Sequence, residues 1–186
     1  MTTTKHQDLV DAIVADHREF EAVFDEIEAS GDARMRRELV EHVIAELVRH
    51  SVAEEEYLYP TARKVLPDGD KIADHELEEH AEAEQVMKEI ENTDATDPKF
   101  TERVDTLIAD IRHHLKDEEE DLLPKLRKAC SQQDLRDLGE KFERAKRMAP
   151  TRPHPSAPDK PPANKILGPG VGLIDKMRDA LTKRNT

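Results

Sequence analysis

The stretch HHLKDEEEDLLP at residues 113–124 repeats an earlier one, HSVAEEEYLYP, at residues 50–60. In each, a histidine (His114, His50) is followed by a glutamate four residues later and by a proline ten residues later. Both lie in long segments rich in Ala, Leu, Glu, Lys and Arg, a composition that favours helix. Residues four apart share one face of a helix. Each stretch therefore predicts a histidine and a glutamate side by side, where an apolar stripe should continue.

Residues that break helices divide the chain into five predicted helical segments. They cover residues 8–29, 33–65, 71–92, 99–129 and 132–148. The short connections between them predict antiparallel neighbours. We therefore expect an all-α fold, an up-down-up-down four-helix bundle with a short fifth helix packed outside it. Pro60 and Pro124 fall late in the second and fourth helices, where each should kink its helix or begin its final turns.

The composition changes at Ala149, which predicts a helical domain over residues 1–148 and a tail over 149–186. The first part of the tail is Pro-rich and should be extended, and residues 171–185 predict a short amphipathic helix. From residue 150 onward, seven Lys or Arg stand against three Asp or Glu. The tail is therefore basic and the remainder strongly acidic. It either packs on its own acidic bundle, stays disordered, or binds a partner or a membrane surface.

The overall composition argues against several classes of function. The net charge is −13 and aromatic residues make up 3% of the chain, which disfavours nucleic acid and anionic membranes as partners. The single cysteine, Cys130, excludes a disulfide within the chain and suits a reducing compartment; we expect a buried or helix-capping thiol. No signal peptide or membrane-spanning run is visible, so the sequence predicts a cytoplasmic protein.

The duplication extends to the first and third helices. HREFEAVFDEIE, beginning at His17, and HAEAEQVMKEIE, beginning at His80, share histidine, valine and isoleucine at the same offsets. The chain therefore reads as two copies of one helical hairpin. In this pairing, His17 corresponds to His80, His50 to His114, and Glu54 to Glu118.

These residues continue the inner stripes of the four helices. The first stripe, for example, runs Leu9, Ile13, His17, Phe20, Phe24, Ile27 and follows the helical spacing of three and four. Each stripe is apolar until it meets its histidine, and two of them add a glutamate one turn later. His113 lies about 100° from the stripe of the fourth helix, so His114 is the inward residue.

Six residues are thus predicted to converge in one layer of the bundle: His17, His50, Glu54, His80, His114 and Glu118. A buried carboxylate without a partner is costly, and the inner stripes carry no Lys or Arg. Metal cations are the natural compensation, and imidazole with carboxylate suits Fe, Mn or Zn better than Mg or Ca. Two glutamates can bridge two ions, and two histidines can complete each, leaving an exchangeable position.

With these residues the chain resembles the hemerythrin-like, or HHE cation-binding, proteins over about residues 8–148. Their pattern is a histidine, H-x-x-x-E, a histidine and H-x-x-x-E on four successive helices. The resemblance implies a four-helix bundle with a non-haem di-iron centre, its two iron ions joined by an oxo or hydroxo bridge. Ferritin-like proteins use E-x-x-H instead, which is reversed in order and different in spacing.

The chain departs from oxygen-carrying hemerythrins, which carry H-x-x-x-H on the third helix. The missing histidine leaves a second open iron position, or another group fills it. Tyr57, three residues after Glu54, is the preferred candidate, with a packed tyrosine as the alternative. Asp121 holds the equivalent place on the fourth helix, and His75 is a weaker candidate. Glu21 and Glu84 are candidates for outer-sphere groups or ligands.

The resemblance and the expected open positions lead to three hypotheses of function. In the first, the centre reacts with hydrogen peroxide, oxygen or nitric oxide, and catalase-like decomposition of peroxide is favoured because an apolar bundle suits small uncharged ligands. In the second, the protein is not an enzyme but binds or senses oxygen reversibly, handles iron or repairs iron centres. In the third, the metal is structural and the basic tail recruits a partner.

Overall fold

A computed structural model describes residues 8–155 together with Asp175 and Asp179. Within these residues the chain is helical and contains no strand, which confirms the all-α prediction. The helices follow in the order α1 (Leu9–Ala29), α2 (Ala33–Ala53), η1 (Glu54–Leu58), α3 (Tyr59–Val65), α4 (Gly69–Glu91), α5 (Pro98–Asp117), η2 (Glu118–Leu122), α6 (Leu123–Ala129) and α7 (Gln132–Met148). The five expected helical segments agree with these bounds to within two residues at each end.

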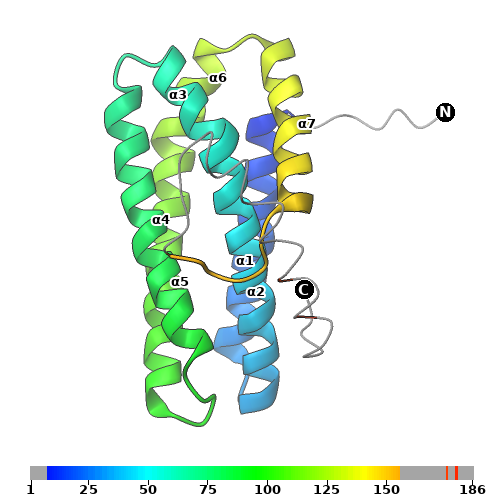
Figure 1. Cartoon of the computed structure of the whole chain (residues 1–186), viewed down its shortest axis with the longest axis vertical. Coiled ribbons are helices and arrows are strands. Elements are labelled where there is room, and N and C mark those ends of the chain that lie inside the picture. Colours follow the sequence, from blue (N-terminus) through cyan, green and yellow to red (C-terminus); the bar gives the residue numbers. More distant parts are fainter. Residues whose placement is uncertain (1–7, 156–174, 176–178, 180–186) are drawn as a thin grey trace, which may run out of the picture.

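The long helices α1, α2, α4 and α5 lie side by side along the length of the molecule (Figure 1). The segment η1–α3 continues α2, and η2–α6 continues α5, so both extensions lie at the same end. From that end α7 runs back and packs against α1 and α2. The described helices include none that is long and apolar enough to cross a membrane.

The helix starts follow from capping residues in the sequence. The side chains of Asp8, Asp32 and Ser131 accept hydrogen bonds from backbone N–H groups in the first turns of α1, α2 and α7. Asp97 does the same for α5, directly ahead of Pro98. Such caps satisfy N–H groups that have no partner within the helix, and each contributes about 1 kcal/mol.

The second and fourth expected helices each contain one π-helical turn, and both turns begin at a predicted metal-binding glutamate. The N–H of Tyr59 donates to the carbonyl of Glu54, and the N–H of Leu123 donates to that of Glu118, five residues back. Pro60 and Pro124 follow directly as the second residues of α3 and α6. A proline lacks the N–H and crowds the carbonyl four residues back, and a wider turn before it eases that crowding.

Two apolar clusters fill the interior, one on either side of the histidine layer. One contains Phe20, Phe24 and Phe100 with the aliphatic side chains around them. The other contains Leu9, Ile13, Phe142 and the buried residues of α3 and α6. The polar layer is therefore enclosed by apolar packing toward both ends of the bundle.

The start of the tail lies against α4. The backbone N–H of His154 donates to Oε1 of Glu84 at 2.7 Å, and Arg152 forms an ion pair with Glu91. Asp175 accepts from the backbone N–H groups of Thr151 and Arg152. Apart from Asp175 and Asp179, the expected tail helix lies outside the described residues.

Candidate metal centre

All six residues singled out in the sequence are buried, and the structure brings them together from four helical segments. Their nitrogen and oxygen atoms form overlapping groups in which all the atoms lie within 4.8 Å of one another. One group consists of His17, His50, Glu54 and Glu118, and another of Glu54, His80 and His114. The two histidines of each helical hairpin thus form a pair. We call these pairs the His17–His50 half and the His80–His114 half of the cluster.

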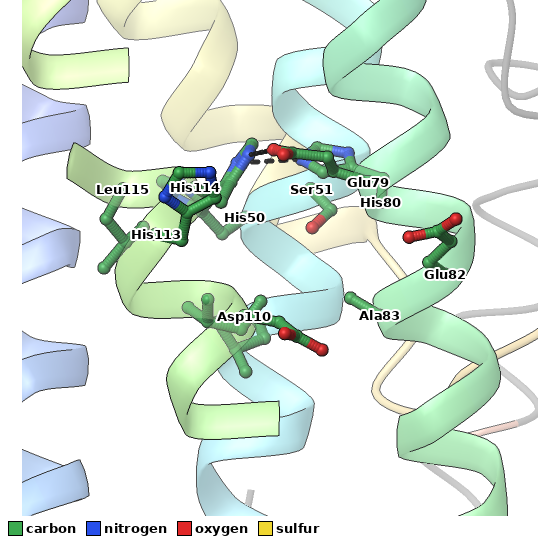
Figure 2. A pocket seen from close by; sticks show the side chains of 12 residues that line it. His50, Ser51, Glu79, His80, Glu82, Ala83, Asp110, His113, His114 and Leu115 are labelled. Atoms are coloured by element: carbon green, nitrogen blue, oxygen red, sulfur yellow. Dashed lines mark hydrogen bonds and ion pairs between the residues drawn. The ribbon is translucent and has the colours of Figure 1, made fainter. Parts of the chain in front are cut away.

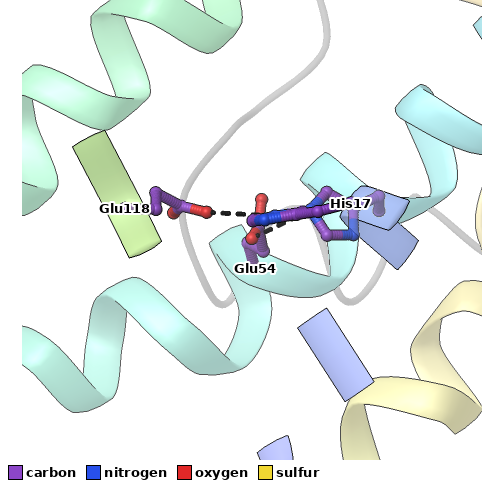
Figure 3. Close-up of side chains that lie close together, drawn as sticks. His17, Glu54 and Glu118 are labelled. Atoms are coloured by element: carbon purple, nitrogen blue, oxygen red, sulfur yellow. Dashed lines mark ion pairs between the residues drawn. The ribbon is translucent and has the colours of Figure 1, made fainter. Parts of the chain in front are cut away.

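The two glutamates connect the halves. Oε1 of Glu54 lies 3.1 Å from Nε2 of His50, and its other oxygen, Oε2, lies 3.5 Å from Nε2 of His80. Oε2 of Glu118 lies 3.5 Å from Nε2 of His17 and 4.0 Å from Nε2 of His114. Figure 3 shows Glu54, Glu118 and His17 converging on one point. Glu54 therefore offers one oxygen to each half, the arrangement required of a bridging ligand.

Several buried atoms in this cluster make no hydrogen bond within the described part of the chain. They are Nε2 of His17, Nε2 of His50, Oε1 of Glu54, Oε2 of Glu76 and Oε2 of Glu118. An unsatisfied buried polar group costs about 1–3 kcal/mol, and native structures hold few of them. Imidazole nitrogens and carboxylate oxygens gathered in this way fit borderline transition-metal ions, which would bond to the atoms of His17, His50, Glu54 and Glu118.

A carboxylate holds the other ring nitrogen of every histidine in the cluster. Nδ1 of His17 lies 2.9 Å from Glu119, and Nδ1 of His80 lies 3.1 Å from Glu55. Nδ1 of His50 lies 2.9 Å from Asp16, and Nδ1 of His114 lies 2.9 Å from Glu79. With each Nδ1 hydrogen-bonded to a carboxylate, each Nε2 faces the cluster, and its lone pair is available to a metal once the ring has given up its second proton.

These outer carboxylates were not predicted, although the duplication carries a signal for them. Glu55 and Glu119 directly follow the cluster glutamates Glu54 and Glu118, and each reaches a histidine on another helix. Asp16 and Glu79 directly precede His17 and His80. An acid at the same position in both copies is the pattern that could have revealed them.

The carboxylates also dominate the electrostatics of the cluster. Burial by itself would lower the pKa of His50 and His80, but Glu54, with Asp16 for His50 and Glu55 for His80, outweighs burial and raises both pKa values to about 9. Burial would raise the pKa of Glu54, yet the neighbouring histidines hold it well below its usual range. The cluster is therefore a strongly cation-attracting site.

Tyr59, and not Tyr57, is the tyrosine of the cluster. The hydroxyl of Tyr59 lies 2.9 Å from Nε2 of His80 and 3.2 Å from Oε1 of Glu118, and its side chain is 1% exposed. Tyr57 is half-buried and lies beside Glu56 and Arg144. The expected direction of Tyr57 assumed an α-helical register, but the extra residue of the π turn rotates the following chain by about 100°.

The same register change moves Asp121 to the surface, where it forms an ion pair with Lys125 at 2.7 Å. The structure also places three further candidates outside the cluster. His75 is exposed and pairs with Glu79 at 3.5 Å. Glu21 is bound by Arg112, and Glu84 accepts from the tail.

Glu76 is a buried carboxylate that the sequence reading missed. Its Oε2 lies 2.9 Å from Nδ1 of His114, and Oε2 of Glu79 lies at the same distance from that nitrogen. Burial and the charge of Glu118 raise the pKa of Glu76. Glu76 precedes His80 by four residues, which places both on one face of α4. That spacing, the reverse of H-x-x-x-E, was the available signal.

Comparison with known proteins places this geometry in a family. The family model described as the hemerythrin HHE cation binding domain matches residues 8–126. An uncharacterised hemerythrin-like protein of Schizosaccharomyces pombe is 32% identical over 174 residues, which is 93% of this chain and 86% of that protein. A match of this length necessarily includes part of the tail.

A second relative is much longer than the shared segment. A DNA nickase of Nostoc is 29% identical over 137 residues, which is 73% of this chain but only 38% of the nickase. No solved structure matches the chain.

Proposed function

The chain belongs to the family of hemerythrin HHE cation-binding domains, and on this premise we propose that it is a non-haem di-iron protein that reacts with a small oxidant. In this proposal an up-down-up-down four-helix bundle holds two iron ions, joined by an oxo or hydroxo bridge. Decomposition of hydrogen peroxide is the favoured reaction, ahead of reactions with oxygen or nitric oxide.

The observation that carries this proposal is the convergence of five buried polar atoms that make no hydrogen bond within the described residues. His17 and His50 would hold one ion and His80 and His114 the other, with Glu54 and Glu118 shared between them. Iron held by nitrogen and carboxylate ligands with a position free for exchange would supply one-electron chemistry toward peroxide, oxygen or nitric oxide.

The protein's own contribution is to orient these ligands and to position one phenol. The four outer carboxylates hold the imidazole rings with Nε2 turned inward. Tyr59 donates to Oε1 of Glu118, beside His80. Burial and the charges of Glu118 and Glu54 raise the pKa of this phenol, whereas a cation bound beside it would lower the pKa again. Tyr59 is therefore our candidate for the group that takes the place of the missing histidine.

The apolar packing supports a small, uncharged reactant. The two clusters that enclose the polar layer leave it buried, and a buried site of this kind suits a molecule of the size of peroxide. The net charge of −13 disfavours nucleic acid, whose binding requires a basic footprint. We propose no nucleic-acid partner and, with one cysteine in the sequence, a cytoplasmic location.

The neighbouring residues His113 and His114 provide the test. Protein made in iron-rich medium is expected to carry about two irons per chain, oxo-bridge absorption and release of oxygen from peroxide above the rate of free iron. His114→Ala should lose iron and turnover, whereas His113→Ala, which changes an exposed residue, should retain iron. Absence of turnover in the iron-loaded protein would reject the catalase-like reaction, and a reversible oxygen spectrum would then assign oxygen binding.

A further inference from the structure

A pocket of about 220 Å³ opens between α2, α4 and α5 and reaches the cluster from one side (Figure 2). The buried histidines His50, His80 and His114 line its inner part. Ser51, on α2, and Ala83, on α4, form part of its walls. The pocket therefore connects the surface with residues proposed to hold metal.

The pocket leads chiefly to the His80–His114 half. Both histidines of that half line it, whereas His17 does not. His50, the remaining histidine, is covered by the rings of Phe20 and Phe142, whose centroids lie 5.1 Å and 5.7 Å from that of His50. The two halves are therefore unequal in access.

The duplication makes the two halves unequal in chemistry as well. Tyr59, which contacts His80, corresponds in the second copy to the apolar residue Leu123. Glu76, four residues before His80, corresponds in the first copy to Ile13. In both of these corresponding positions the polar residue, Tyr59 or Glu76, lies beside the His80–His114 half. The half that the pocket reaches is therefore also the one with additional polar groups.

The mouth of the pocket is acidic. Glu82 and Asp110 are exposed there, and Glu79 is half-buried beside them. The exposed histidine of the mouth, His113, pairs with the carboxylate of Asp117 at 3.4 Å. The described residues that line the pocket include no lysine or arginine, and the whole chain carries a net charge of −13. A concave site lined by one sign of charge repels like-charged molecules on approach and leaves uncharged ones unaffected.

We propose that this pocket is the entrance through which small molecules reach the His80–His114 half, and that its acidic mouth admits uncharged molecules while it slows anions. The inference rests on the proposed metal centre and specifies its substrate class. Peroxide, oxygen and nitric oxide are all uncharged at neutral pH, whereas azide and nitrite are anions.

Charge reversal at the mouth tests the selectivity. The variant Glu82→Lys/Asp110→Lys is compared with Glu19→Lys/Glu26→Lys, which makes the same change in net charge at exposed positions of α1. In iron-loaded protein at low ionic strength, the mouth variant should bind azide about tenfold faster than wild type, and the control less than about threefold faster. High salt should remove the difference, and association of nitric oxide should stay within about twofold. Equal effects of the two variants would overturn the proposal.

Narrowing the pocket tests the route. Ala83→Leu should slow the association of both azide and nitric oxide by about tenfold without changing the iron content. Ala22→Leu, at an exposed position of α1, should change neither rate. If the Ala83→Leu variant does not fold, Ser51→Leu narrows the pocket from α2 instead. Wild-type rates in a narrowed, iron-loaded variant would place the entrance elsewhere, whereas a wild-type chain that holds no iron would overturn the proposed function itself.

Discussion

The hydroxyl oxygen of Tyr59 lies 2.9 Å from Nε2 of His80, inside the buried cluster. Tyr57, only two residues earlier, lies beside Arg144 of α7 instead. One chain segment thus presents two tyrosines in different environments, and the π turn between Glu54 and Leu58 decides which of them faces the cluster.

This difference predicts a spectroscopic contrast. If Tyr59 completes the coordination of iron, the iron-loaded protein should show a broad visible phenolate band. Tyr59→Phe should abolish the band, because no other phenol lies in the cluster among the described residues. Tyr57→Phe is the matched control and should retain it. A band that survives in Tyr59→Phe would show that the phenol of Tyr59 does not bind iron.

Removal of an outer carboxylate should weaken the binding of metal. Glu119→Gln removes the charge that holds Nδ1 of His17, and loss of such a partner commonly weakens metal binding by about 10–100-fold. The adjacent acid, Glu120, is exposed, so Glu120→Gln should leave the affinity unchanged. Competition with a chromophoric chelator measures the metal affinity of both variants. Equal affinities of the two variants would mean that the outer carboxylates do not tune the site.

Removal of metal by a chelator should make stability depend on pH between about 6.5 and 9. In the folded chain the pKa of His50 and of His80 is raised to about 9 by the neighbouring carboxylates, above the ordinary value near 6.5. The stabilising contribution of the protonated rings is therefore fully present below pH 6.5 and is lost as the pH rises through 9.

Urea unfolding at pH 6, 7.5 and 9 measures this dependence. The chelated protein should lose stability over the series, while the metal-loaded protein, whose ligands are deprotonated at all three values, should change much less. A chelated protein of constant stability would contradict the assigned direction of the pKa shifts.

A substitution in α7, which lies outside the segment that the family model matches, should strongly lower the stability of the fold. Phe142 of α7 is fully buried and packs edge-on against the ring of His50. Phe142→Ala should lower the free energy of unfolding by about 3–5 kcal/mol, because it removes a buried aromatic ring and leaves a cavity. Met148→Ala, at a half-exposed position of the same helix, should change it by about 0.5 kcal/mol or less. Similar losses in both variants would argue against this packing role of α7.

Much of the fold could be predicted from the sequence because the signals for it are local. The capping aspartates and the loop residues at 30–32, 66–68 and 92–97 mark the ends of helices. The spacing of Leu9, Ile13, His17 and Phe20 marks the buried face of α1 without any knowledge of its neighbours. The preferred position of Tyr57 was wrong because the π turn at Glu54–Leu58 interrupts the α-helical spacing. Tyr59, two residues later, therefore faces the cluster instead.

The sequence by itself determined the helical segments and the six residues that meet in the cluster, because a duplicated pattern with helical period specifies one face of each helix. Only the tertiary structure decided which acids hold the histidines, which tyrosine joins them and where the cluster opens to the surface. These features depend on contacts between helices, such as Glu119 with His17 across 102 positions of the chain. A periodic pattern states which way a side chain points, but the partner that it meets is set by how the helices pack.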